Sequence, residues 1–355
     1  MGVTADNDSD MGYSFGIPVV TKLNSGKWVV LLTSGYNNGQ LNTDQTANSP
    51  TGSGQGYLYV RDVINGSPIS KISTGEGNSS TPSGLAKITA IAVDPNTNNI
   101  TSHVYGGDLL GNLWRFDINT ATKQKIAQLK GPGGSDLQPI TTAPEVGLIN
   151  KKRVIFVGTG KYLEQADLLT TQVQTVYAIK DDDLNAELTG LRSPSVLVEQ
   201  KLISGGNTRT VNDVPVNFTT GLGWFLDFDP GERVNIDPLL VNSVLLMPTT
   251  VPSSTSCLGG GFGWFNYFNY KTGGSANIPG DLVSEKLNTP AVGFNLTYKD
   301  GKPVISVVES NDPTPHQIKE KGVAGQSGVA RSTVFDKYPD GTSGKRSIWR
   351  ELIKP

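Results

Sequence analysis

The apolar residues of this chain fall in short runs, and few stretches show the 3.6-residue repeat of a helix. The runs are rich in valine, isoleucine and aromatic residues, and glycine, proline, asparagine or serine separates them, as between β-strands. In the first unit, strands over residues 16–20, 27–32 and 56–62 are predicted, with a long polar loop over 37–56. The pattern therefore predicts an all-β protein.

Similar units recur along the rest of the chain. The later copies hold strands near 88–94, 103–108 and 111–117, then 143–146, 153–160 and 175–179, then 223–228, 239–247 and 263–268, then 290–292 and 304–308. A recurrence of roughly 40–60 residues is the period of a β-propeller blade. Blades bury their faces by stacking around a centre, so we predict one propeller of mostly antiparallel strands over residues 1–355. One or two packed β-sandwiches are the alternative.

One segment breaks this pattern. Residues 181–201 begin with the acidic triplet Asp181, Asp182 and Asp183 and continue through a stretch that could hold a short helix. We interpret the segment as an insertion between blades. The triplet lacks the alternate spacing of a cation site, so a solvated surface loop is the expected structure.

Composition and charge exclude several classes of protein. The 355 residues include 42 glycines and 21 prolines, and the net charge is −2, which argues against a nucleic-acid-binding surface. No stretch approaches the ~20 apolar residues of a transmembrane helix, and the first residues lack a signal-peptide pattern. We therefore expect neither nucleic acid nor a membrane span.

The residues that most often carry catalysis are scarce. Cys257 is the only cysteine, so an internal disulfide and a Cys-based structural zinc site are excluded. With His103 and His316 as the only histidines, and no Gly-x-Ser-x-Gly, a Ser–His–acid triad is not expected. The glycine-rich stretches 52–56 and 259–263 lack the features of a phosphate loop. We expect no catalytic and no cofactor-binding residues.

The histidines and tryptophans fit structural positions. His103 is expected to be a satisfied histidine at the start of a strand, and His316 an exposed loop residue. Trp114, Trp224, Trp264 and Trp349 lie in predicted strands, where packing in the core is the expected role and ligand stacking the alternative.

A loop between two predicted strands has the spacing of a calcium site. Oxygen ligands at positions one, three, five, seven and nine of an EF-hand-like loop would be Asp94, Asn96, Asn98, the carbonyl of Ile100, and Ser102. Only Asp94 is a carboxylate, Pro95 stiffens the loop, and Asn99 stands where glycine is usual. Calcium affinity should therefore be poor, and a metal-free asparagine-rich turn is the alternative.

Several motifs together resemble one family. They are Tyr13-Ser-Phe-Gly-Ile-Pro-Val19, Trp28-Val-Val30, Gly35-Tyr-Asn37, Tyr105-Gly-Gly-Asp-Leu-Leu-Gly-Asn-Leu-Trp-Arg-Phe-Asp117, Val157-Gly-Thr-Gly-Lys-Tyr-Leu163, Gly223-Trp-Phe-Leu226, Gly231-Glu-Arg233 and Ile348-Trp-Arg-Glu-Leu352. In this order, from near residue 13 to residue 352, they resemble the C-terminal propeller of the PilY/PilC family of type IV pilus tip-associated proteins.

The resemblance implies a modified seven-bladed propeller cut from a longer protein with an N-terminal von Willebrand-like module. It implies a non-enzymatic role in pilus assembly, control of extension and retraction, twitching motility and surface adhesion. The implied location is extracellular, at the pilus tip or outer cell surface. The implied partners are minor pilins and a host or abiotic surface.

The resemblance also bears on the calcium loop and on Cys257. The family's calcium loop aligns with Asp94, Asn96, Asn98, Ile100 and Ser102, but the family pattern has several aspartates and this chain keeps one. The family tends to have a cysteine near Cys257, whose partner would be missing here. Residues 37–56 and 311–344 are the candidate adhesive loops, with inert solvent-facing loops as the alternative.

Two other functions remain open. A quinoprotein-dehydrogenase-like propeller would be an enzyme that needs calcium and a quinone, but the chain lacks adjacent cysteines and acid–base pairs placed for a quinone pocket. A generic extracellular propeller that binds carbohydrate or a host ligand is the other alternative.

Overall fold

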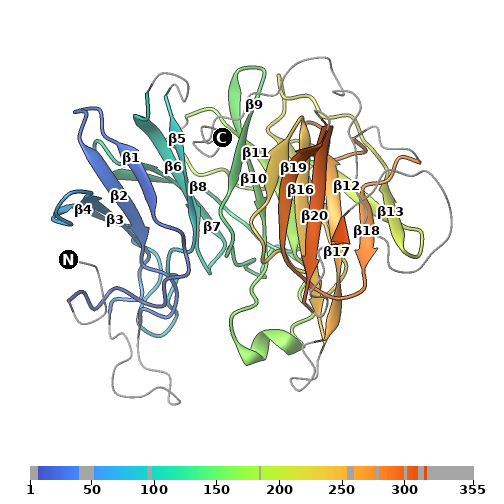
Figure 1. Cartoon of the computed structure of the whole chain (residues 1–355), viewed down its shortest axis with the longest axis horizontal. Coiled ribbons are helices and arrows are strands. Elements are labelled where there is room, and N and C mark those ends of the chain that lie inside the picture. Colours follow the sequence, from blue (N-terminus) through green and yellow to red (C-terminus); the bar gives the residue numbers. More distant parts are fainter. Residues whose placement is uncertain are drawn as a thin grey trace.

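The computed structural model describes residues 7–39, 52–93, 98–183, 185–253, 260–276, 280–299, 302–310 and 316–317. Within these ranges the chain is almost entirely β-structure, and the only helix is the short 3-10 helix η1 (Gln165–Leu169) (Figure 1). No helix in the described ranges has the length and hydropathy needed to cross a bilayer.

The first two sheets are four-stranded antiparallel meanders whose strand order follows the sequence. The first sheet contains β1 (Val19–Lys22), β2 (Trp28–Thr33), β3 (Tyr57–Asp62) and β4 (Pro68–Ser73). The second contains β5 (Ile88–Ala92), β6 (Thr101–Gly107), β7 (Asn112–Asp117) and β8 (Thr122–Gln128). The predicted inner strands of both units are confirmed, whereas the outer strands β4 and β8 were missed.

Three further groups of strands, here numbered as the third, fourth and fifth sheets, follow in chain order, and the third and fourth are parts of one larger sheet. The third contains β9 (Glu145–Ile149), β10 (Lys152–Gly158), β11 (Thr175–Asp181) and β14 (Gly223–Asp227). The fourth contains β15 (Leu239–Val241), β16 (Val244–Pro252), β17 (Gly261–Asn269) and β18 (Ser284–Leu287). The fifth contains β19 (Ala291–Lys299), β20 (Lys302–Glu309) and β21 (His316–Gln317). His316 therefore lies in a strand, and its placement in a loop was wrong.

A hairpin joins the third and fourth sheets. Its strands are β12 (Val198–Ser204) and β13 (Thr208–Val211). β12 pairs in parallel with β14, with Val198 opposite Trp224, and β13 pairs with β18, so the two sheets form one ten-stranded sheet. The segment 181–201 lies between β11 and β14, which are neighbours in the third sheet. The short helix predicted there is absent from residues 185–201, which form turns and the start of β12.

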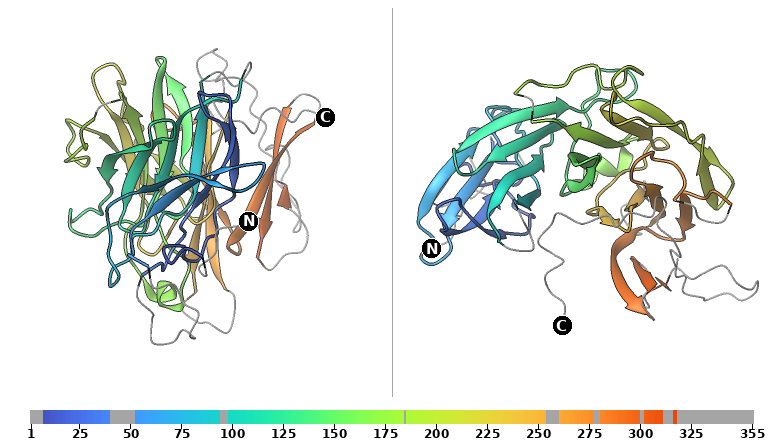
Figure 2. Two further views of the ribbon diagram at one scale, coloured as in Figure 1. Left: turned by 90° about the vertical axis from the view of Figure 1, so that its left-hand side faces the viewer. Right: turned by 90° about the horizontal axis from the view of Figure 1, so that it is seen from above.

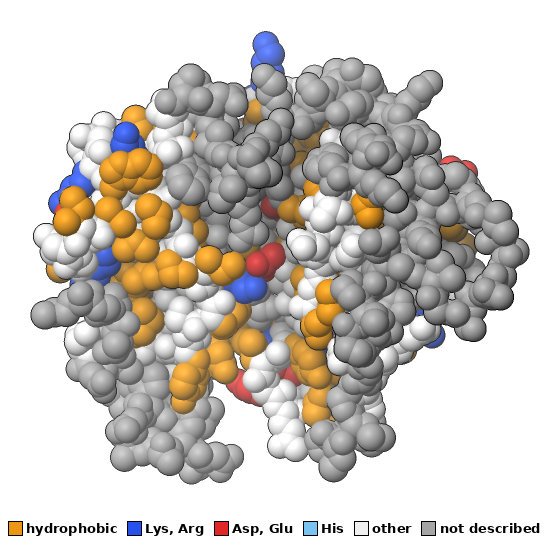
Figure 3. Space-filling model, in the orientation of Figure 1, with side chains coloured by type: hydrophobic (Ala, Val, Ile, Leu, Met, Phe, Trp, Pro, Cys, Tyr) orange, Lys and Arg blue, Asp and Glu red, His pale blue; other side chains and the backbone are white. Residues whose placement is uncertain are grey.

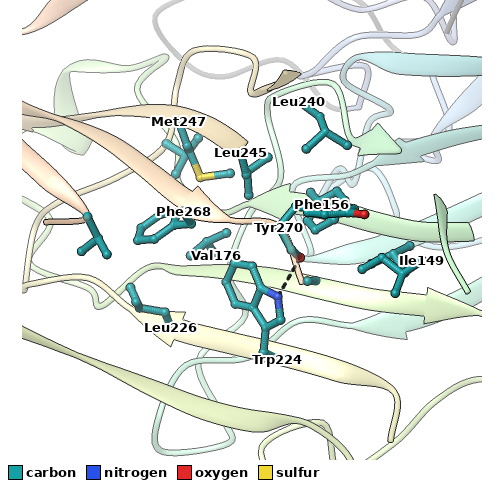
Figure 4. Packing of buried hydrophobic residues seen from close by; sticks show 14 of the residues in the cluster. Ile149, Phe156, Val176, Trp224, Leu226, Leu240, Leu245, Met247, Phe268 and Tyr270 are labelled. Carbon is teal, nitrogen blue, oxygen red and sulfur yellow. Dashed lines mark hydrogen bonds between the residues drawn. The ribbon is translucent and has the colours of Figure 1, made fainter. Parts of the chain in front are cut away.

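The hydrophobic core consists of four clusters, one at each seam between successive sheets. At the third seam Phe156, Trp224 and Met247 pack together, and the indole Nε1 of Trp224 donates a hydrogen bond of 3.1 Å to the carbonyl of Tyr270 (Figure 4). Trp114, Trp224 and Trp264 are all buried, which confirms their predicted place in the core.

Seen from above, the described sheets follow an arc from the first sheet to the fifth (Figure 2). Side-by-side sheets of this kind are the predicted propeller arrangement, and the sandwich alternative is wrong. The described residues form four hydrogen-bonded sheets, or five blade-like units when the ten-stranded sheet is divided at its hairpin, so the count of seven blades stays a prediction. Cys257, Trp349 and most of the two candidate adhesive loops lie outside the described residues.

Candidate functional site

The predicted calcium loop connects β5 to β6, and the structure describes only its second half. Asp94 and Asn96 lie outside the described residues. The side-chain oxygen of Asn98 accepts a hydrogen bond of 3.1 Å from the amide of Ile100, and the carbonyl of Ile100 accepts one of 2.8 Å from Val93. The hydroxyl of Ser102 donates to the carbonyl of Ile91 at 3.1 Å. Each of the three predicted ligands therefore makes a hydrogen bond within the loop or to β5.

The end of this loop is fixed to the first sheet. The carbonyl of Asn99 accepts hydrogen bonds from the amide of Lys22 at 3.0 Å and from the hydroxyl of Thr21 at 2.8 Å. Ile100 also forms an isolated parallel bridge with Lys22. These contacts join the loop to β1 across the first seam, so the conformation of the loop and the packing of the first two sheets are coupled.

The oxygen ligands that the loop offers are poorly suited to calcium. Calcium prefers several carboxylates among its six to eight oxygen ligands. Asn98, Ile100 and Ser102 can supply only neutral oxygens, and the described residues contain no group of three or more His, Cys, Asp or Glu side chains able to hold a metal. The charge of any calcium site would come from Asp94 alone, so calcium at this loop stays a prediction.

Close to this loop, the acidic triplet takes part in a cluster of ion pairs. Asp181 is buried at the end of β11, where one carboxylate oxygen accepts hydrogen bonds from Tyr105 at 2.6 Å and the other from Arg115 at 2.5 Å. Arg153 donates to the hydroxyl of Tyr105 at 2.9 Å and pairs with Asp183. The expectation of a solvated loop was wrong for Asp181, because strands from two sheets converge on it.

The remaining members of the triplet also have cationic partners. Asp182 lies 3.2 Å from the amine of Lys180 and 3.3 Å from that of Lys152. Burial raises the pKa of Tyr105, and the neighbouring carboxylate of Asp181 raises it further. The phenol therefore stays protonated and donates to Asp181. The arrangement joins β6, β7, β10 and β11 through their side chains.

His103 lies beside this cluster on β6. Its Nε2 atom is 3.5 Å from a carboxylate oxygen of Asp183, and its buried Nδ1 has no hydrogen-bond partner in the described part of the chain. Burial lowers the pKa of His103 and the charge of Arg153 lowers it further, while Asp183 acts in the opposite direction. The expectation of a fully satisfied histidine was therefore wrong.

A buried aspartate organises the most specific sequence motif, residues 105–117. The carboxylate of Asp108 accepts hydrogen bonds of 2.9 Å from the amides of Leu110 and Asn112, the side-chain nitrogen of Asn112, and the indole of Trp114. Gly111 has a φ of +75°, a conformation that side chains other than glycine rarely adopt. Burial raises the pKa of Asp108 to about 6, against the effect of these donors. The motif is thus a turn folded around one carboxylate.

A buried arginine organises the Gly231-Glu-Arg233 motif. Arg209 donates to both carboxylate oxygens of Glu232, at 3.1 and 2.8 Å, and both side chains are almost completely buried. Its guanidinium carbon lies 3.6 Å from the ring centroid of Trp264. Sequence analysis missed Arg209, because nothing in its polar strand indicates a buried ion pair with a residue 23 positions away.

The next residue of this motif holds a loop in place. Arg233 donates hydrogen bonds to the carbonyls of Lys161 at 3.1 Å, Asp167 at 2.5 Å and Thr170 at 2.9 Å. These carbonyls lie before, within and after η1. Arg233 therefore fixes residues 161–170, a segment that begins within the motif at residues 157–163 and includes η1.

An ion pair and a hydrogen bond on the same carboxylate connect the segments that precede the first strands of three sheets. The amine of Lys87, just before β5, lies 3.0 Å from a carboxylate oxygen of Asp237, just before β15. The same oxygen of Asp237 accepts a hydrogen bond of 3.0 Å from the amide of Ala143, just before β9. The first strands of the second, third and fourth sheets are therefore fixed relative to one another.

An open hollow lies between the β8–β9 connection and the segment after η1. It encloses about 810 Å³ and is lined by Gly131, Pro132, Gly133, Ser135, Asp136, Leu137, Thr171, Gln172 and Val173. Two of these lining residues are joined, because the side chain of Gln172 donates a hydrogen bond of 2.9 Å to the carbonyl of Leu137. This lining offers a carboxylate, a hydroxyl and backbone groups, so it suits a polar segment better than an apolar ligand.

Comparison with known proteins identifies the family. A sequence model of the PilY1 beta-propeller domain matches residues 3–204, more than half of the chain. The chain belongs to the PilY1 β-propeller family. This confirms the resemblance inferred from the sequence motifs.

The relatives of this PilY1 family member include proteins named as type IV pilus biogenesis factors. A type IV pilus biogenesis factor PilY1 homolog from Xylella fastidiosa is 28% identical over 340 residues, covering 86% of this chain and 22% of the relative. Type IV pilus biogenesis factor PilY1 from Pseudomonas aeruginosa is 28% identical over 327 residues, covering 78% of this chain and 27% of the relative. The chain thus spans about a quarter of the length of these relatives.

The fold agrees with a solved member of the family. The crystal structure of the Pseudomonas aeruginosa PilY1 C-terminal domain matches with a TM-score of 0.68 and 22% identity, covering 87% of this chain and 73% of that one. In the chain described here, the motifs around Asp108, Glu232 and Arg233 have structural roles. Each of these side chains forms hydrogen bonds with other residues of the same chain.

Proposed function

We propose that this chain is the propeller module of a non-enzymatic type IV pilus biogenesis factor. In this proposal it acts in pilus assembly and in the control of extension and retraction, and through these in twitching motility and surface adhesion. Membership of the PilY1 β-propeller family carries the proposal, since the matched relatives are named as type IV pilus biogenesis factors.

The partners and location of this module follow from the same proposal. The module would dock on minor pilins at the tip of the pilus or at the outer cell surface, and its loops would contact a host or abiotic surface. Loops held on a rigid β-scaffold are well suited to such binding. The ion pairs that join β7 and β10 to the end of β11 would keep the loop after β11 rigid.

Gene deletion in the source bacterium tests this proposal. Loss of the complete gene should reduce the number of surface pili, the diameter of twitching zones and adhesion, and the complete gene should restore all three. Unchanged piliation, motility and adhesion would refute the proposal. Immunogold labelling of sheared pili should find the protein at their tips, and label confined to the cell body would contradict the tip location.

A variant of the complete protein tests whether the propeller itself is needed. Arg209→Ala breaks the buried pair with Glu232 and should reproduce the deletion phenotype. The matched control is Lys201→Ala, which removes an exposed cation paired with Glu199 and should leave piliation normal. The quinoprotein alternative predicts turnover or a spectral change on addition of pyrroloquinoline quinone, and we expect neither.

A further inference from the structure

The hollow beside η1 is walled by two segments from different parts of the chain. One wall is the connection from β8 to β9, residues 131–137. The other is residues 171–173, which follow η1, the coiled ribbon at the bottom of Figure 1. Its volume of about 810 Å³ is within the range of roughly 300–1,000 Å³ that is usual for ligand-binding pockets. The hollow is therefore large enough for a ligand, and it lies outside every motif singled out in the sequence.

Two glutamine side chains join the walls to each other. Gln138 is fully buried and donates hydrogen bonds to the carbonyl of Val173 at 2.9 Å and to the hydroxyl of Thr175 at 2.7 Å. From the opposite wall, Gln172 donates to the carbonyl of Leu137 at 2.9 Å. The walls are thus held in place by the fold itself, so little conformational entropy would be lost when a ligand binds between them.

The second wall offers main-chain donors that the fold leaves unused. The carbonyls of Gln172 and Val173 accept hydrogen bonds from the amide of Gly231 and the side chain of Gln138. In contrast, the amides of Thr171, Gln172 and Val173 donate to no acceptor within the described part of the chain. Consecutive free amides on a segment that leads into a strand, here β11, are what a further extended chain needs for main-chain pairing.

The first wall is open because two of its residues are glycines that the fold does not require. Gly131 and Gly133 line the hollow, and neither has a positive φ. A Cβ atom added at these positions would meet its nearest neighbours, in Asp136 and Ser135, at 3.6 and 3.8 Å, which is ordinary van der Waals contact. Glycine at these two positions instead suits a ligand that approaches the main chain closely.

The lining also limits the chemistry of the ligand. Among its described residues there is no aromatic side chain on which a sugar ring could stack, and no lysine or arginine that could bind an anion. The charge in this lining comes from Asp136, which is exposed and has no ion-pair partner in the described ranges. The surface over the first sheet is different, because hydrophobic side chains gather there, on the left of the view in Figure 3. A cationic and otherwise polar ligand therefore fits the hollow best.

We propose that this hollow binds an extended, basic polypeptide segment of a partner protein. The main chain of the segment would pair with the amides of residues 171–173, and a lysine or arginine side chain would pair with Asp136. Main-chain pairing supplies affinity in complexes of this kind, and the side-chain contact supplies selectivity. The inference goes beyond the pilus function and holds or fails independently of it, because it rests on the hollow alone.

Hydrogen exchange on the full chain tests the main-chain pairing. The probe is the blocked heptapeptide acetyl-Thr-Val-Thr-Lys-Thr-Val-Thr-amide at millimolar concentration. The probe should slow exchange at residues 171–173 and leave the β3–β4 turn unchanged, where Ile64 is 91% exposed. The same peptide with its internal amides N-methylated should have no effect, because the methyl groups keep the two main chains apart. Unchanged exchange at residues 171–173 with the unmodified probe would overturn the proposal.

A charge exchange tests the role of Asp136. In fluorescence anisotropy, the lysine peptide should bind the unaltered chain at least about three-fold more tightly than the matched glutamate peptide, as expected for one exposed ion pair. Asp136→Lys should reverse this preference. The matched control is Glu199→Lys, at an exposed acid on β12 outside the lining, and it should leave the preference as it is. Equal binding of the two peptides to the unaltered chain, or the same preference in Asp136→Lys, would overturn the proposal.

Filling the hollow gives a third test that changes no charge. Gly133→Leu adds a large side chain to the first wall and should weaken binding of the lysine peptide at least ten-fold. Gly293→Leu is the control, because a Cβ atom added there meets nothing within 4 Å and the residue lies outside the lining. Binding to Gly133→Leu that is as tight as binding to the unaltered chain would show that the peptide lies elsewhere, and would overturn the proposal.

Discussion

The guanidinium of Arg209 lies between the carboxylate of Glu232, to which it donates two hydrogen bonds, and the ring of Trp264, 3.6 Å from the ring centroid. Glu232 also accepts a hydrogen bond of 2.5 Å from the hydroxyl of Thr249. These residues come from β13, β16, β17 and the segment after β14. The pair therefore connects the β12–β13 hairpin to the core of the fourth sheet.

Removing one member of this pair should be strongly destabilising. Arg209→Ala leaves the fully buried carboxylate of Glu232 without its cation, which should lower the free energy of unfolding by about 3–5 kcal/mol. Urea denaturation followed by tryptophan fluorescence measures this change. Lys201→Ala, at an exposed pair, should change stability by less than ~0.5 kcal/mol. Similar effects of the two variants would contradict the structural role of Arg209.

Asp108 should make stability fall as pH rises. Its pKa is about 6 in the folded chain and near 3.8 when unfolded, so the folded state holds the proton more tightly between these values. Below pH 3.8, Asp108 contributes about 3 kcal/mol to the free energy of unfolding, the value that corresponds to a shift of roughly two pKa units. This contribution is lost as the pH rises through 6. Denaturation curves across this range measure it.

The control for this titration is Asp108→Asn. The amide cannot ionise, so the fall in stability between pH 4 and 6 should flatten, while overall stability drops because a carboxylate that accepts from four donors is lost. An unchanged pH profile in this variant would show that another group is responsible.

His103 should act on stability at mildly acid pH. Because burial and Arg153 lower its folded pKa below 6.5, the unfolded chain binds the proton more readily. Stability should therefore be unaffected by this residue above pH 6.5 and should fall as the pH drops below that value. NMR titration should show one histidine that protonates below the pH expected for a free side chain. His103→Gln should remove that signal, and its persistence would contradict the assignment.

Calcium binding at the β5–β6 loop can be decided by calorimetry. If the loop binds calcium, the heat of binding should disappear in Asp94→Ala, which removes the loop's only carboxylate, and affinity should be weak. Asn99→Ala changes a residue outside the predicted ligand set and serves as the matched control. No heat at millimolar calcium in the unaltered chain would end the hypothesis.

The sequence predicted the first three strands of each of the first two sheets and missed the fourth. Strands such as Trp28–Thr33 and Asn112–Asp117 carry the apolar residues that fill the seams, so their composition identifies them. β8 (Thr122–Gln128) lies at the edge of its sheet and is mostly polar, so no hydrophobic run marks it. The burial of Trp114, Trp224 and Trp264 was predicted correctly for the same reason, because these residues lie in strands of apolar composition.

The ion pairs could not be predicted, because their partners are distant in sequence. Arg115 and Asp181 are 66 positions apart and meet only because β7 and β11 pack against each other across the second seam. Likewise, the parallel pairing of β12 with β14 depends on the path of a hairpin and leaves no local pattern. Asp94 and Asn96 lie outside the described residues, so the geometry of the calcium loop stays a sequence prediction.

The ten-stranded sheet has a mechanical consequence. The third and fourth sheets share continuous backbone hydrogen bonding through the β12–β13 hairpin, whereas other neighbouring sheets meet through side-chain packing and isolated bridges. Under tension applied to the two ends of the chain, the first sheets can peel away singly, while the third and fourth must yield as one unit. Force spectroscopy would record that unit as the longest single extension of the unfolding trace.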